Sequence, residues 1–239
     1  MINCIEYSTE FYEKCGRISS ASLEGDNLIL QNQSYSFLND YCCWIEQLSS
    51  RPEVVLYEQA CREYESAFLS VTIGQYRQAF FGLRLCLELS LGGVFFSSNE
   101  LELRTWISGK RDLKWSEITD DDKGIFSSNF TRAFFEELIE KGKIYKGIAE
   151  KVYRECSEFV HGNYHATSNL PNEIIFDQSA FGIWHEKAKS IRLVILYCFV
   201  CRYICFLEAN SLRAVEENVL EELGHLSAVR NQYGGTVGG

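Results

Sequence analysis

The chain has 239 residues, of which 46% are hydrophobic and 14% aromatic, enough to bury the core of one globular domain with appendages. Its 33 acidic and 23 basic side chains give a formal net charge of −10. General nucleic-acid binders are normally basic overall, so this charge counts against broad, non-selective binding of nucleic acid. The 2 prolines permit long uninterrupted helices over most of the chain.

The N-terminal part of the chain differs in character from the rest. Around Gly25 it alternates small, polar and apolar residues, which is typical of a short β-hairpin or an extended arm. We therefore predict an N-terminal appendage over residues 1–34. A helical bundle domain is expected over residues 35–225, followed by a flexible tail over residues 226–239.

The next segments predict an all-α fold. A short helix is expected over residues 35–48, and a longer one begins just after Pro52, where a proline fits a helix start. Residues 75–96 are apolar almost all the way round, as in the central helix of a bundle. Arg77, Arg84 and Glu88 are the exception and share one narrow face of this helix.

Further helices are expected downstream. Residues 101–122 predict a short helix, a loop and a further turn around Trp115, and residues 130–139 are amphipathic. The most apolar run, residues 191–207, is interrupted by two arginines and is shorter than the roughly 20 apolar residues of a membrane span. We interpret it as part of a buried bundle helix over residues 180–210.

The clearest candidate for chemistry lies in the helical stretch over residues 144–162. Arg154 and His161 are seven residues apart, almost two turns, so their side chains should project from one face. Gly162 can end the helix at that point, and the helix C-terminus favours a cationic imidazole, which raises its pKa. Beside them runs an apolar stripe expected to face the core. The stripe consists of Ile144, Ile148, Val152, Cys156 and Phe159.

Two readings of this pair remain open at this point. Arg154 could pair with Glu150 or Glu158, each four residues away, in a surface ion pair worth roughly 0.3–0.5 kcal/mol. His161 would then be a C-terminal cap. In the other reading, Arg154 and His161 form a site, with Ser157 between them on the same face.

The segment YRECSEFVHG, residues 153–162, resembles the RxxxxxxH active-site motif of the HEPN superfamily. These are four-helix-bundle proteins of ribonuclease toxins, abortive-infection systems and phage-defence modules. Residues 75–98 and 102–118 are similar to the helical region before this motif, and the likeness spans about residues 55–210. The resemblance implies metal-independent RNA cleavage in a composite site shared by a homodimer, acting as a toxin or effector with a cognate antitoxin or defence-system partner.

Within that resemblance, Arg154 would stabilise charge on the phosphate and His161 would act as acid or base. Ser157 could hydrogen-bond the phosphate or orient the imidazole. Glu155 stands where active members often carry Asn, Asp or His. That departure and the acidic balance favour the alternative function, a catalytically inactive HEPN-like scaffold or partner-binding module.

Further accessory residues are expected around the pair. Arg84 and Glu88 could satisfy each other, or their face could meet the Arg154 side, with Glu88 holding Arg154 or the imidazole in place. Tyr164 and His165 lie in a loop just after the helix and are candidate contacts.

The ten cysteines do not predict a metal site or a disulfide framework. Cys198, Cys201 and Cys205 share a helix face and should fill core volume, and no paired CxxC knuckles occur. We expect no cofactor and no metal. The acidic N-terminus lacks the pattern of a signal peptide, so a cytoplasmic protein without a membrane partner is expected.

Overall fold

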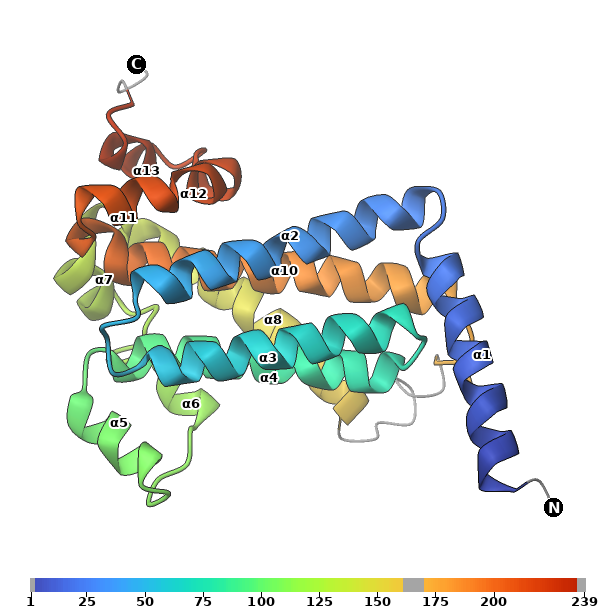
Figure 1. The fold of residues 1–239 in the computed structure, drawn as a ribbon. Helices are drawn as coiled ribbons and strands as arrows, with labels where there is room; N and C mark the ends of the chain where they lie inside the picture. The colour runs from blue at the N-terminus through green and yellow to red at the C-terminus, as the bar shows by residue number, and fades with distance from the viewer. Residues whose placement is uncertain (1–2, 161–169, 236–239) are drawn as a thin grey trace.

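The computed structural model describes residues 3–160 and 170–235, and every regular element in these two stretches is helical. The all-α prediction is thereby confirmed. Six long helices in these stretches build a bundle, with α1 standing steeply inclined at one end (Figure 1). The long helices are α1 (Cys4–Ser22), α2 (Asp26–Gln47), α3 (Val54–Thr72), α4 (Tyr76–Phe96), α8 (Gly142–Val160) and α10 (Gln178–Tyr203).

Short helices connect and cover the ends of the long ones. Those between α4 and α8 correspond to the helix, loop and turn predicted over residues 101–122 and to the amphipathic segment after them. They are α5 (Glu100–Ile107), α6 (Trp115–Ile118), α7 (Ser128–Phe134) and η1 (Glu136–Lys141). Those after α10 are η2 (Ile204–Phe206), α11 (Ala209–Ala214), α12 (Glu216–Leu223) and α13 (Ser227–Gln232).

The N-terminal residues are helical, so the predicted β-hairpin or extended arm is wrong. α1 starts after Asn3, whose side chain accepts hydrogen bonds from two backbone N–H groups of the first turn. Gly25, with φ of +56°, supplies the turn into α2. The turn signal was therefore correct, but it joins two helices. α2 runs unbroken through Ser34, past the predicted start of the bundle domain.

Helix α4 is the centre of the bundle, as its all-round apolar character predicts. It packs against α3, α8 and α10. By length and composition alone α4 could cross a membrane, but 72% of its most apolar window is buried inside the bundle. Burial against three helices therefore accounts for its composition.

A glycine lets α3 and α4 approach closely. A Cβ atom added at Gly82 would lie 2.8 Å from the Cβ atom of Ala67 and 2.9 Å from the carbonyl oxygen of Glu63. Both distances are shorter than the separation of well-packed atoms. The residue at this crossing must therefore lack a side chain.

One end of the bundle is fixed by a buried carboxylate. Glu53 is 1% exposed and accepts hydrogen bonds from Arg51 Nε at 2.5 Å and from the Tyr203 hydroxyl at 2.8 Å. The Tyr57 and Tyr203 hydroxyl oxygens lie 2.6 Å apart. This network joins the start of α3 to the end of α10 and satisfies the buried charge.

The C-terminal part corrects the predicted tail. Leu226 is 6% exposed and Val229 is fully buried, and residues Ser227–Gln232 form helix α13, so this part of the predicted tail is helical and packed. Glu222 of α12 forms an ion pair with Arg192 of α10. Helix α12 is thus bound to the bundle.

The cysteines of α10 only partly follow the core prediction. Cys198 and Cys201 are buried, whereas Cys205 is exposed because α10 ends at Tyr203 and η2 follows.

Candidate functional site: the C-terminal part of helix α8

Helix α8 is amphipathic as predicted, but its buried face is displaced from the predicted stripe. Tyr145, Ala149, Val152 and Cys156 are buried. Ile144, which was expected to begin the stripe, is 57% exposed. The apolar pattern favoured burial of Ile144 over Tyr145, because isoleucine is the more apolar residue. The helix instead buries the Tyr145 ring, which stacks on Tyr197 with ring centroids 3.8 Å apart.

Arg154 lies exposed on the outer side of α8. It forms no ion pair or hydrogen bond with any residue that the structure describes. The alternative pairing with Glu150 or Glu158 is therefore absent there, and Glu150 lies instead 3.7 Å from the Lys146 ammonium. Toward the described residues none of its five N–H donors is engaged, so they can contact a ligand or water.

The neighbours of Arg154 are engaged with other groups. Glu155 points toward α10, where its carboxylate lies 2.7 Å from the Lys187 ammonium. This ion pair raises the pKa of Lys187 and compensates the charge of Glu155. The Ser157 hydroxyl donates a hydrogen bond to the Tyr153 carbonyl oxygen at 2.6 Å and keeps acceptor capacity.

The end of α8 is held by an arginine of α4. Arg77 donates from Nε to the Phe159 carbonyl oxygen at 3.1 Å and from Nη2 to the Val160 carbonyl oxygen at 3.3 Å. These carbonyls are among those that a helix leaves without an internal partner. The Phe159 ring also stacks on Phe80, with centroids 4.1 Å apart. The backbone that carries Arg154 is therefore anchored up to the last described residue of the helix.

The charged face of α4 meets α8, though at Tyr153 and not at Arg154. Arg84 donates to the Tyr153 hydroxyl at 2.8 Å and lies 4.8 Å from that ring's centroid. Glu88 lies 3.9 Å from Arg84, and burial raises the pKa of Glu88. The mutual pairing of Arg84 and Glu88 is thus present, and the predicted hold of Glu88 on Arg154 is not found.

Sequence reasoning missed Tyr153, which joins α8 to both α4 and α6. Its ring stacks on Trp115 of α6, with centroids 3.8 Å apart and planes 6° from parallel. Nothing in the spacing of these two aromatic residues indicated a contact across 38 positions of sequence. His161, Tyr164 and His165 lie outside the described residues.

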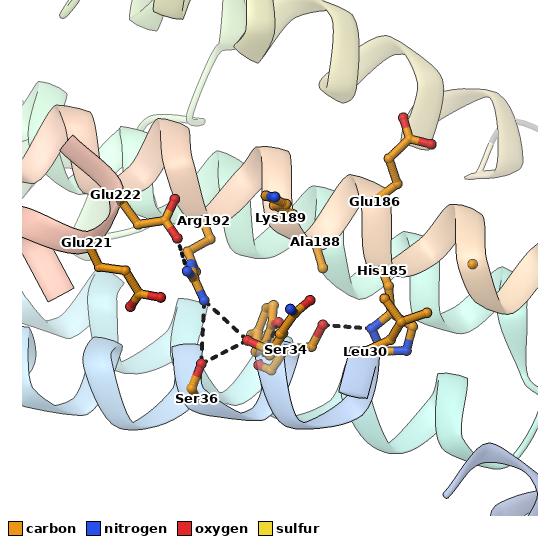
Figure 2. A pocket seen from close by; sticks show the side chains of 13 residues that line it. Leu30, Ser34, Ser36, His185, Glu186, Ala188, Lys189, Arg192, Glu221 and Glu222 are labelled. Carbon is orange, nitrogen blue, oxygen red and sulfur yellow. Dashed lines mark hydrogen bonds and ion pairs between the residues drawn. The ribbon is translucent and has the colours of Figure 1, made fainter. Parts of the chain in front are cut away.

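A second cluster, also missed, surrounds a cavity of about 350 Å³ between α2, α10 and α12. Figure 2 shows its lining side chains, with Arg192 of α10 reaching toward both Glu222 and α2. Arg192 Nη1 donates to the Gln33 carbonyl oxygen at 3.2 Å. Deeper in the bundle, Ser34 Oγ lies 2.7 Å from His185 Nδ1.

The Ser34 and His185 pair is suited to structure more than to catalysis. His185 is 4% exposed, and burial lowers its pKa to about 4, so the ring is neutral at pH 7. Its Nε2 has no hydrogen-bond partner among the described residues. Ser34 lies within α2, whose amide groups are used by the helix, so the oxyanion donors needed for acyl transfer are missing there.

Comparison of the chain with protein-family models, with curated proteins and with solved structures finds no match. Among the described residues, no group of three or more His, Cys, Asp or Glu side chains is placed to hold a metal ion. What this part of the chain offers chemically is an exposed guanidinium on a helix whose end is fixed, which suits contact with a phosphate.

Proposed function

We propose that this protein is a HEPN-like, metal-independent endoribonuclease that acts as a toxin or effector in a toxin–antitoxin or antiviral defence system. The observation that carries the proposal is Arg154, an exposed arginine without an intramolecular partner in the described part of the chain. It stands seven residues before His161, in the order and spacing of the family's motif.

The proposed chemistry needs two roles. The Arg154 guanidinium stabilises the negative charge that grows on the scissile phosphate, with two N–H groups directed at its oxygens. The His161 imidazole accepts the proton of the ribose 2′-hydroxyl or donates one to the leaving 5′-oxygen. Attack by the 2′-oxygen breaks the P–O5′ bond and leaves a 2′,3′-cyclic phosphate and a 5′-hydroxyl.

The Glu155 contact supports activity despite the departure from the family pattern. A free carboxylate next to Arg154 would repel a phosphate, but the ion pair with Lys187 offsets that charge and draws the carboxylate toward α10.

The net charge of −10 restricts the substrate. Weak non-specific attraction to RNA fits an enzyme that cuts a defined structured RNA through a local basic site. The proposed assembly is a homodimer in which two copies of the motif face each other, because one helix end offers little surface to hold a nucleotide. The same acidity favours the second candidate, an inactive HEPN-like scaffold that docks on a basic partner.

The test is RNA cleavage by the purified chain in the presence of EDTA. Arg154→Ala and His161→Ala should each abolish cleavage, whereas Arg213→Ala should retain it because that exposed arginine lies on α11. The products should carry 2′,3′-cyclic phosphate ends. Absence of cleavage in every form, with the fold and the dimer retained, would favour the scaffold.

A further inference from the structure

Two cysteines face each other across helices α2 and α3. The Sγ atoms of Cys42 and Cys61 lie 3.8 Å apart, which is van der Waals contact for two sulfurs. Both are free thiols. The two residues stand on either side of the connection between α2 and α3, so the two helices bring them together directly.

The two thiols differ in access. Cys42 is exposed and Cys61 is partly buried. Burial, followed by the neighbouring Cys42, raises the pKa of the Cys61 thiol to about 12. Cys42 is therefore the thiol that meets a reagent from solvent first, while Cys61 remains protonated behind it.

The adjacent Cys43 is held away from this pair. Its thiol contacts the Ala214 carbonyl oxygen of α11 at 3.3 Å, and burial raises its pKa. Cys205, in contrast, is an exposed cysteine near the buried Cys201, and no sulfur contact like that of Cys42 and Cys61 joins them in the described part of the chain. Cys4 and Cys205 are thus exposed thiols outside this pair, and Cys205 serves as the matched control.

We propose that Cys42 and Cys61 are an oxidative modification site, which a hydroperoxide converts into a disulfide joining α2 to α3. The Cys42 thiolate attacks the peroxide, breaks its O–O bond and becomes a sulfenic acid as hydroxide or alkoxide leaves. The Cys61 sulfur then attacks the Cys42 sulfur, and water leaves with the Cys61 proton. Overall two thiols lose two electrons and two protons to the peroxide.

The geometry allows this second step. A disulfide needs the sulfurs about 2.05 Å apart, so they must approach by a little under 2 Å from their present contact. Rotation about the two Cα–Cβ bonds supplies displacements of that size.

The experiment treats the full reduced chain with hydrogen peroxide at neutral pH, then blocks the remaining thiols under denaturing conditions. Free thiols should fall by two from the initial ten. Mass spectrometry of the digest should show the Cys42 peptide linked to the Cys61 peptide. A dithiol reductant should restore both thiols.

Variants separate this pair from general thiol oxidation. Cys61→Ser should leave Cys42 as a sulfenic acid that a dimedone probe traps, with no crosslink. Cys205→Ser should leave the Cys42–Cys61 crosslink unchanged. The proposal is overturned if the wild-type digest contains a Cys42–Cys43 or intermolecular disulfide in place of this one, or if Cys42 is oxidised without losing the Cys61 thiol.

Discussion

Replacing His185 should make the protein less sensitive to mild acid. Burial lowers the pKa of this ring to about 4 in the folded chain, against about 6.5 in the unfolded chain. The unfolded state therefore binds the proton first as the pH falls. Stability that is fully present above pH 6.5 is lost progressively down to pH 4, by about 2 kcal/mol at pH 5 and roughly 3 kcal/mol below pH 4.

The variant His185→Gln keeps a group that can hydrogen-bond the Ser34 hydroxyl but has no titration in this range. Urea unfolding of both proteins at pH 8 and pH 5, followed by circular dichroism, gives the free energy of unfolding at each pH. Between these pH values the wild type should lose about 2 kcal/mol more than the variant.

The exposed His225 provides the matched control, because His225→Gln removes an imidazole of the same kind from the surface. Its pH dependence should follow that of the wild type. The charged residues of the neighbouring cavity, among them Arg192, Lys189 and Glu222, are present in all three proteins, so their contribution cancels. Parallel pH profiles for the wild type and His185→Gln would refute the reasoning.

Three local contacts lead to further expectations. Gly82→Ala should lower the free energy of unfolding by about 1–3 kcal/mol, because the added methyl group overlaps α3. Gly147→Ala, where the added Cβ meets open space, should raise the free energy of unfolding by about 0.4–1 kcal/mol. If urea unfolding shows that both variants change the free energy in the same direction, the packing at Gly82 is contradicted. Arg77→Ala should cost under about 1 kcal/mol overall but speed hydrogen exchange in the last turn of α8, and unchanged exchange would argue against the cap. Glu53→Leu should cost about 2–4 kcal/mol by leaving buried polar groups unpaired, and a denaturation midpoint equal to that of the wild type would contradict this.

The long helices were predictable from the sequence because their signal is strong and local. Residues 75–96 and 191–207 are apolar on almost all sides, and such runs form helices that are buried within a bundle. They appear as α4 and as the second half of α10 with η2. The helix start near Pro52 and the turn at Gly25 were also predictable, because proline restricts the backbone conformation and glycine allows conformations that other residues avoid.

The N-terminal error has a physical cause. Several large apolar side chains of residues 16–35 are exposed, among them Leu23, Leu28 and Ile29. The buried positions include Ser22, Gln31 and Ser34. When tertiary contacts bury polar side chains, the buried face of a helix shows no repeat of apolar residues in the sequence, so the helix is not predicted. Gln31, for example, donates to Thr72 of α3 at 3.1 Å, a contact that no local pattern indicates.

The candidate site was predictable to a similar degree. The helix that carries Arg154 follows from local sequence, but the partners of its neighbours do not. Arg77, Tyr153 and Lys187 acquire their roles because α4, α6 and α10 converge on α8. Such contacts depend on the packing of helices far apart in sequence.

Cleavage of one labelled structured RNA by Arg154→Ala, beside Lys151→Ala, tests the central claim most directly. Lys151 is 66% exposed, lies one turn earlier on α8 and carries the same charge. The account predicts that Arg154→Ala slows cleavage by about 100-fold or more, as expected for removal of a group that stabilises the transition state, while Lys151→Ala changes the rate by no more than about threefold. Equal losses in the two variants, or cleavage that does not depend on Arg154, would contradict it.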